Sequence, residues 1–227
     1  MDVDKTKAEQ PSPMGRVLVV TSVPAEQEAV LRGLSNTNRV DVIVSGVGIA
    51  SAAASTAAAL VRGQYDLVIN TGIGGGFKGQ ADLEDVVVAT EIVAADLGAE
   101  TTEGFTSIDQ LGFGSNRLTV ESELVKKVTT LLRSAGKQVK AGPILTLSTV
   151  TGTKQSALDL SGRIPGAMIE AMEGFGVATA ASQQGVKFLE IRAVSNLVGP
   201  RDRESWKIKE ALDQLTEVSS ILEEGLR

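Results

Sequence analysis

Two short polar segments carry the groups in this chain that are best suited to chemistry. The segment EAMEG, Glu170–Gly174, carries the Glu173 carboxylate just before a helix-like run rich in alanine and glycine from Gly174 to Ser182. Asn196 follows the strand-like apolar run Phe188–Val194. In open α/β sheets, ligands bind outside the carboxyl ends of the strands. We therefore expect the Glu173 carboxylate and the Asn196 amide to face one cleft.

The composition removes most other catalysts. The 227-residue chain contains no histidine and no cysteine. A Ser-His-Asp triad, an imidazole base, a thiolate nucleophile and a Cys/His metal site are therefore excluded. Acid–base work falls to carboxylates, amides, lysine, tyrosine or water. We expect no metal and no organic cofactor.

Three of the candidate side chains also have simpler structural explanations. Glu26 begins the helix expected after the first strand, where an acid also complements the helix dipole without any catalytic role. From spacing alone, that structural role is the simpler interpretation. Asn196 suits a turn as well as a ligand. Trp206, the only tryptophan, either packs the last helix onto the core or covers a planar ligand.

A glycine-rich segment, Asn70–Gly76, follows a short apolar strand. It is not a dinucleotide fingerprint, because the sixth position counted from Gly72 is Phe77, and it lacks the Gly-Lys-Ser/Thr of a P-loop. Glycines after a strand let a ligand approach the backbone closely, although a plain tight turn has the same pattern. We predict a loop that faces a ligand through Ile73 and Gly74.

The elements that must position these groups alternate along the chain. Such alternation predicts an α/β fold with helices on both faces of a central sheet. Apolar runs and helical periodicity predict strands at Arg16–Thr21, Val40–Ser45, Leu67–Asn70, Asp85–Ile92, Lys140–Ser148 and Phe188–Val194, and helices at Pro24–Leu34, Ala50–Val61, Leu118–Ala135, Lys154–Leu160 and Trp206–Leu226.

Charge and hydropathy limit the partners and the location. The net charge of −6 and a pI of about 4.9 argue against nucleic-acid binding. No run of about 18 apolar residues predicts a membrane helix, and no signal peptide is evident, so a cytoplasmic protein is expected. Residues 1–15 are polar and predict a disordered tail before a single domain, residues 16–227. Residues 96–116 predict a loop or a lid.

Three motifs in this order carry a family resemblance: INTGIGGGF at Ile69–Phe77, EAMEG at Glu170–Gly174 and IRAVSN at Ile191–Asn196. Together they resemble the nucleoside phosphorylase and nucleosidase superfamily, in the branch of methylthioadenosine/S-adenosylhomocysteine nucleosidases. The resemblance implies a three-layer α/β/α sandwich around a central mixed, partly barrel-like sheet, assembled as a homo-oligomer. Within that branch, the chain is most similar to the futalosine hydrolases, through TSVPAE, STVTGT, EAMEGFGVA and SNLVGPRDRESW.

The resemblance also implies roles for single residues in binding a purine nucleoside. The water-activating glutamate falls on Glu26, with Glu28 as the neighbouring candidate. The other implied roles are ribose binding by Met172 and Glu173, purine contact by the backbone of Val150 and Thr151, closure over the base by Trp206, and Asn196 in place of the family's catalytic aspartate.

Asparagine at position 196 fits a particular base. A carboxamide can donate its NH2 to the O6 atom of a 6-oxopurine and accept from a protonated N7 atom. The residue therefore favours hypoxanthine, the base of futalosine, over adenine. An amide cannot supply the N7 proton as a titrating acid, and the source of that proton stays open.

Alternatives remain at the sequence level. Phosphorylases bind phosphate with arginine clamps, and neither Val17–Leu31 nor Ile69–Phe77 contains arginine, so water is the expected nucleophile. An adenine-releasing nucleosidase and a non-catalytic nucleoside-binding protein are the rival functions. Arg201 and Arg203 are candidates for binding the benzoate-like carboxylate of futalosine, but a solvated loop is the favoured interpretation of both.

Overall fold

The computed structural model describes residues 15–36 and 38–225 of the chain. The predicted disordered segment, residues 1–15, lies outside the described residues except for Gly15, as does the predicted helix end at Leu226. Within the described part, no helix is long and apolar enough to cross a membrane. In the same part of the chain, His, Cys, Asp and Glu side chains form no group of three or more that could hold a metal ion.

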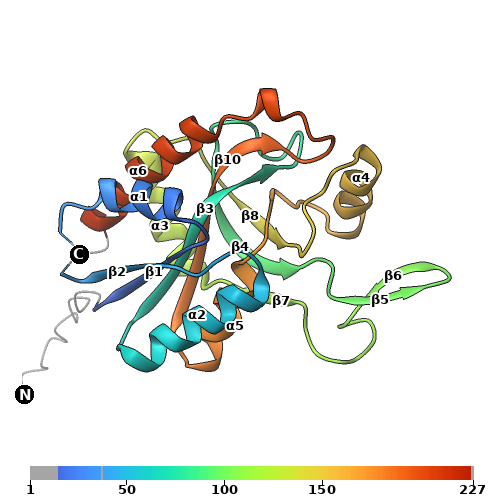
Figure 1. The fold of residues 1–227 in the computed structure, drawn as a ribbon, viewed down its shortest axis with the longest axis horizontal. Helices are drawn as coiled ribbons and strands as arrows, with labels where there is room; N and C mark the ends of the chain where they lie inside the picture. The colour runs from blue at the N-terminus through green and yellow to red at the C-terminus, as the bar shows by residue number, and fades with distance from the viewer. Residues whose placement is uncertain (1–14, 37, 226–227) are drawn as a thin grey trace, which may run out of the picture.

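A mixed β-sheet forms the centre of the molecule (Figure 1). β2, β1, β3 and β10 run parallel, as do β4, β8 and β9, whereas β4 is antiparallel to β10 and β9 is antiparallel to β3. The path from β3 through β10, β4, β8 and β9 therefore returns to β3 and closes a barrel. The strands of this sheet are β1 Val17–Thr21, β2 Val40–Val44, β3 Leu67–Gly76, β4 Val86–Ala94, β7 Arg117–Thr119, β8 Val139–Thr146, β9 Ile169–Ala171 and β10 Lys187–Leu197.

Helices cover both faces of this sheet, as predicted, and the three-layer α/β/α architecture is confirmed (Figure 1). α1 packs beside α6 on one face, and α2 packs beside α5 on the other. Successive side chains of β1 point to opposite faces of the sheet, so both faces are apolar and each is covered by helices. Leu18 and Val20 pack toward α2 and α5, whereas Val17 and Val19 pack toward α1 and α6. The helices are α1 Pro24–Gly33, α2 Ile49–Arg62, α3 Ser122–Ser134, α4 Lys154–Arg163, α5 Gly174–Gln183 and α6 Ile208–Gly225, with a 3-10 turn η1 at Arg203–Ser205.

The prediction of a glycine-rich loop was wrong, because β3 continues through Gly76. β3 pairs with β1, β10 and β9, and its glycines leave room for the neighbouring chain segments to approach it closely. A methyl group on Gly74 would lie 2.6 Å from Ile169 Cγ2 and 2.9 Å from the Glu170 carbonyl oxygen. The glycines therefore allow strands to pack closely here instead of forming a turn.

Other boundaries also differ from the predictions. Asn196 lies inside β10 rather than after it, and Trp206 lies between η1 and α6 rather than in the final helix. The helix predicted from Leu118 begins at Ser122, because the residues before it form β7. The predicted loop 96–116 includes a projecting hairpin, β5 Gly98–Thr101 and β6 Gly104–Ser107 (Figure 1).

Candidate active site

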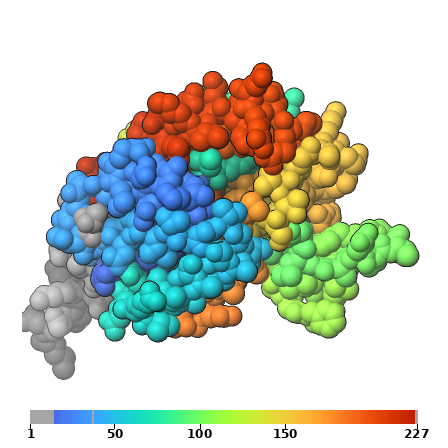
Figure 2. All heavy atoms as spheres, in the orientation of Figure 1, coloured from blue at the N-terminus to red at the C-terminus, as the bar shows by residue number. Residues whose placement is uncertain are grey.

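A cavity of about 290 Å³ opens at the carboxyl ends of β1, β3, β8, β9 and β10. Figure 2 shows the hollow between the N-terminal part of the chain in blue, the segment before α4 in yellow and the C-terminal segment in red. Every predicted site residue except Thr151 lines it: Glu26, Ile73, Gly74, Val150, Met172, Glu173, Asn196 and Trp206. This is the edge where an α/β sheet binds ligands.

The Glu26 carboxylate is held by two backbone donors. Oε2 accepts a hydrogen bond from the Ser22 N–H at 2.9 Å, and Oε1 accepts one from the Ile73 N–H, also at 2.9 Å. The side chain is only 3% exposed. Glu28, the neighbouring candidate, is exposed on α1 and does not line the cavity. The geometry therefore favours Glu26 as the reactive carboxylate of this helix.

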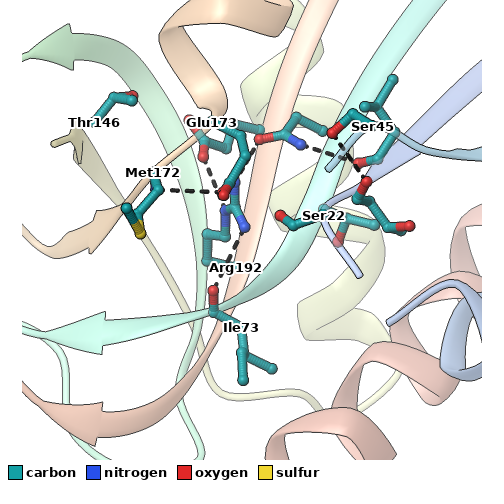
Figure 3. Close-up of polar contacts among 12 residues, drawn as sticks. Ser22, Ser45, Ile73, Thr146, Met172, Glu173 and Arg192 are labelled. Atoms are coloured by element: carbon teal, nitrogen blue, oxygen red, sulfur yellow. Dashed lines mark hydrogen bonds and ion pairs between the residues drawn. The ribbon is translucent and has the colours of Figure 1, made fainter. Parts of the chain in front are cut away.

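Glu173 meets a buried arginine that the sequence predictions omitted. Arg192 Nη2 lies 3.3 Å from Glu173 Oε2 (Figure 3). The same nitrogen donates to Asn70 Oδ1 at 2.5 Å, and Arg192 Nε donates to Glu190 Oε1 at 2.9 Å. Glu173 also accepts from the backbone N–H groups of Gly48 and Met172, both at 3.3 Å. These contacts fix the Glu173 carboxylate at the start of α5.

The charged groups of this cluster shift one another's pKa values. Burial disfavours the charged guanidinium, but Glu190, Glu173 and Glu26 outweigh that effect and raise the pKa of Arg192 above its ordinary value. Burial also raises the pKa of Glu190, although Arg192 opposes that rise. Arg192 therefore stays charged and neutralises part of a site rich in carboxylates.

Asn196 owes its position to an irregularity in β10. The register with β3 shifts between Val194 and Asn196, so Ser195 is an extra residue in the ladder. Such bulges redirect the side chains around them. The Ser195 hydroxyl donates to Asn196 Oδ1 at 2.9 Å, and Asn196 Nδ2 donates to the Leu197 carbonyl at 3.2 Å. The second Nδ2 hydrogen is left for a ligand.

The remaining predicted residues enclose the cavity in different ways. Val150 lines the cavity and is partly exposed. Trp206 forms another part of the lining, and the Arg201 guanidinium lies 5.2 Å from the centroid of its ring, which is a cation–π contact. Thr151 is buried behind the lining, where its N–H donates to Glu170 Oε1 at 3.1 Å. The backbone donor of Thr151 is therefore already used within the protein.

A larger cavity, about 370 Å³, lies between α1, α6 and strands β1 to β3, and is lined mainly by aliphatic side chains. None of the predicted site residues lines it. The smaller cavity combines several buried carboxylates with an arginine and an amide, which is the chemistry of an active site. We therefore assign the active site to the smaller cavity.

The predictions from sequence also omitted Ser22, Glu170 and Ser195 as lining residues. One signal in the sequence could have revealed the arginine cluster. Glu190 and Arg192 alternate within an otherwise apolar strand, so both project from the same face of β10. Two charges on one buried face indicate an internal ion pair, because an unpaired buried charge is costly.

Gly72 offers a direct test of this packing. A methyl group there would overlap with Glu26 Oε1 and would lie 2.6 Å from Arg192 Nη1. We expect Gly72→Ala to displace both groups, to cost about 1–3 kcal/mol of stability and to lower turnover by roughly tenfold. Denaturation and steady-state kinetics measure the two effects. Gly162→Ala on α4, where nothing lies within 4 Å of the added methyl, is the matched control: turnover should not change, and stability should not fall, because alanine is the better helix former.

Comparison with known families agrees with this fold. The family model described as "Phosphorylase superfamily" matches residues 15–224. The chain therefore belongs to the phosphorylase superfamily.

Individual relatives narrow that assignment. The chain is 46% identical to the futalosine hydrolase of Streptomyces coelicolor in an alignment that covers 88% of this chain and 92% of that protein. It is 45% identical to the futalosine hydrolase of Acidothermus cellulolyticus over 87% of this chain and 86% of that protein. Within the superfamily, these relatives place the chain in the futalosine hydrolase family.

A solved structure supports the fold at lower sequence identity. The methylthioadenosine/S-adenosylhomocysteine nucleosidase of Neisseria meningitidis, determined in complex with methylthio-immucillin-A, superposes with a TM-score of 0.81 at 23% identity. The match covers 93% of this chain and 100% of that structure. The barrel and its flanking helices are therefore the nucleosidase fold.

Proposed function

We propose that this chain hydrolyses the N-glycosidic bond of futalosine and releases hypoxanthine and dehypoxanthine futalosine, a step of menaquinone biosynthesis. The observation that carries the proposal is the Asn196 amide, which lines one cavity with the carboxylates of Glu26 and Glu173. The identity of 46% to a futalosine hydrolase supports the same substrate. The reaction needs water and no cofactor.

Asn196 recognises the leaving base in this proposal. The Leu197 carbonyl can only accept, so it marks the nitrogen side of the amide, and the second Nδ2 hydrogen can donate to O6 of hypoxanthine. The amide oxygen keeps a lone pair for an N–H at N7 of the departing base. Hydrogen bonds of this kind discriminate strongly between bases, because the wrong base leaves buried polar groups unpaired.

Glu173 stabilises the sugar as the bond breaks. The C–N bond lengthens first and leaves positive charge on the ribose ring, as in other glycoside cleavages. The buried Glu173 carboxylate, beside Met172, would hold the 2′-hydroxyl and place negative charge near that cation. Arg192 and two backbone N–H groups keep the carboxylate in place.

Water is the nucleophile in this proposal, and Glu26 takes its proton as it attacks C1′. Two arginines are among the described lining residues. Arg192 is occupied by Glu190, Glu173 and Asn70, and Arg201 lies against Trp206. Neither resembles a free bidentate clamp for phosphate, which favours hydrolysis over phosphorolysis.

Product analysis tests the function. The purified protein is incubated with futalosine or with methylthioadenosine, with and without inorganic phosphate, and the free base is followed by chromatography. We expect hypoxanthine from futalosine at a rate that phosphate does not change. Faster release of adenine would favour the rival nucleosidase, and a requirement for phosphate would make the protein a phosphorylase. Binding without release of any base would indicate a non-catalytic protein.

Exchange of the amide tests base recognition. We expect Asn196→Asp to lower kcat/KM for futalosine by about ten- to a hundredfold, because a carboxylate loses the donor to O6. The relative rate with 6-aminopurine nucleosides should rise, since their exocyclic amine can donate to the carboxylate. Asn38→Asp, at an exposed position outside this cavity, is the control. An unchanged ratio between the two substrates would contradict the role of Asn196.

The same proposal includes a single domain, residues 16–227, in the cytoplasm, and its assembly as a homo-oligomer, which the family resemblance implies. Size-exclusion chromatography with light scattering measures the assembly. A monomeric enzyme with full activity would remove the oligomer from the proposal and leave the chemistry unchanged.

A further inference from the structure

Glu170 is a buried carboxyl in the cavity for which the proposed mechanism has no use. Its side chain lines the cavity, and the residue is only 5% exposed. Oε1 accepts the Thr151 N–H at 3.1 Å. Oε2 is buried and has no hydrogen-bond partner among the described residues. A buried acceptor without a donor is destabilising, so a ligand that supplies an N–H at this point would be favoured.

The sheet places Glu170 and Asn196 on either side of Gly75. In the ladder of β9, β3 and β10, Gly75 is the register partner of Glu170 on one side and of Asn196 on the other. A methyl group on Gly75 would lie 3.2 Å from Asn196 Nδ2 and 3.3 Å from Glu170 Cγ. Val198 Cγ2 would lie 3.1 Å from the same methyl, so a side chain at this position would be crowded. The Asn196 amide and the Glu170 side chain therefore flank Gly75 on the face of the sheet to which its Cβ would point.

Burial and the groups near Glu170 act on its charge in opposite directions. Burial raises the pKa of the Glu170 carboxyl, while the hydrogen bonds to Thr151 and the nearby charge of Arg201 oppose the rise. Oε1 is turned to the backbone of the loop before α4. The N–H of Thr151, in the segment that the family resemblance assigns to purine contact, is thereby withdrawn from any ligand. On this side of the cavity, a ligand therefore meets the Glu170 carboxyl in place of the Thr151 N–H.

We propose that Glu170 determines base specificity by accepting the N1–H of a 6-oxopurine, while Asn196 donates to the adjacent O6. This proposal rests on the proposed function, and it identifies the group that recognises a second atom of the base, N1. A 6-oxopurine has a hydrogen on N1, whereas a 6-aminopurine has a lone pair there. The lone pair of adenine would face a carboxyl oxygen without a hydrogen between them, so the site rejects adenine at N1 as well as at the exocyclic position.

Glu170→Gln is the sharpest variant, because it changes the direction of one hydrogen bond. The amide oxygen can still accept the Thr151 N–H, and the NH2 group then presents a donor where Oε2 presented an acceptor. We expect kcat/KM for futalosine to fall about ten- to a hundredfold, the size of a lost hydrogen bond to a charged group. The value for the 6-amino counterpart of the same nucleoside should stay constant or rise, and the affinities for free hypoxanthine and adenine, measured by calorimetry, should converge.

A matched control separates this role from support of the loop. Asp96 also accepts a backbone N–H from the loop before α4, that of Ser148 at 2.6 Å, but it is exposed and does not line the cavity. Asp96→Asn should leave the preference between the two nucleosides unchanged. An equal loss on both substrates in Glu170→Gln would overturn the proposal and leave Glu170 a structural residue.

A test with the unchanged protein avoids any folding defect in the variant. Binding of hypoxanthine is compared with binding of 1-deazahypoxanthine, which has a C–H in place of the N1–H. We expect affinity to fall at least tenfold, and equal affinities would overturn the proposal. Failure of the proposed function is a separate outcome: a protein that distinguishes these two bases but releases no hypoxanthine from futalosine would retain the Glu170 assignment and lose the activity.

Discussion

Replacing Glu26 with glutamine should lower the turnover of futalosine at least a hundredfold and leave hypoxanthine binding nearly unchanged. Loss of a general base costs about a hundred- to ten-thousandfold in rate. Glutamine has the same shape, and its amide oxygen can keep one of the hydrogen bonds from Ser22 and Ile73. Single-turnover kinetics measure the chemical step, and calorimetry with hypoxanthine measures the binding.

Glu28→Gln is the matched control, because it makes the same change two residues along the same helix at an exposed position. Its turnover should equal that of the unchanged protein. The reverse result, a large loss at Glu28 and none at Glu26, would mean that the carboxylate held by two backbone N–H groups is structural and that water is activated elsewhere. A loss of binding in Glu26→Gln would show that the variant disturbs the site rather than the chemical step.

The fold was predictable because local patterns determine most of it. Alternating apolar strands and amphipathic helices place the hydrophobic faces of both element types in one core, and the order of elements follows from the chain. β9 was missed because it is only three residues long and has no pattern of its own. Its hydrogen bonds come from β3 and β8, far away in the sequence. Only tertiary pairing makes it a strand.

The site could be predicted where a polar residue interrupts an apolar pattern, because few structural roles explain such a residue. Glu173 and Asn196 interrupt apolar patterns, so their positions in the cavity followed from the sequence. Glu170 was not singled out, because nothing in its local sequence shows that β9 pairs it with Gly75 or that Thr151 donates to it. The glycine-rich strand was misread for the same reason, since its glycines are explained by neighbours that come from other parts of the chain.

Arg192→Met should destabilise the protein by about 3–5 kcal/mol, because it leaves Glu190 and Glu173 buried without their cation. For a chain of this size, we expect Tm to fall by roughly 6–20 °C. Chemical denaturation and thermal melting measure the effect. The control is Arg117→Met, which removes a half-exposed ion pair with Glu91 and should cost less than about 1 kcal/mol. Similar losses in the two variants would mean that the buried cluster carries no special cost.

A double variant separates the electrostatic cost from the loss of packing. In Arg192→Met with Glu190→Met, the fully buried carboxyl goes with its partner, and Glu173 keeps the N–H groups of Gly48 and Met172. Replacing a buried ion pair with apolar groups is often neutral for stability, so most of the lost stability should return. Activity should not return, because Glu173 would still lack the guanidinium that orients it. Stability and activity would then depend on different contacts of the same arginine: the bond to Glu190 balances a buried charge, and the bond to Glu173 positions the group that meets the sugar.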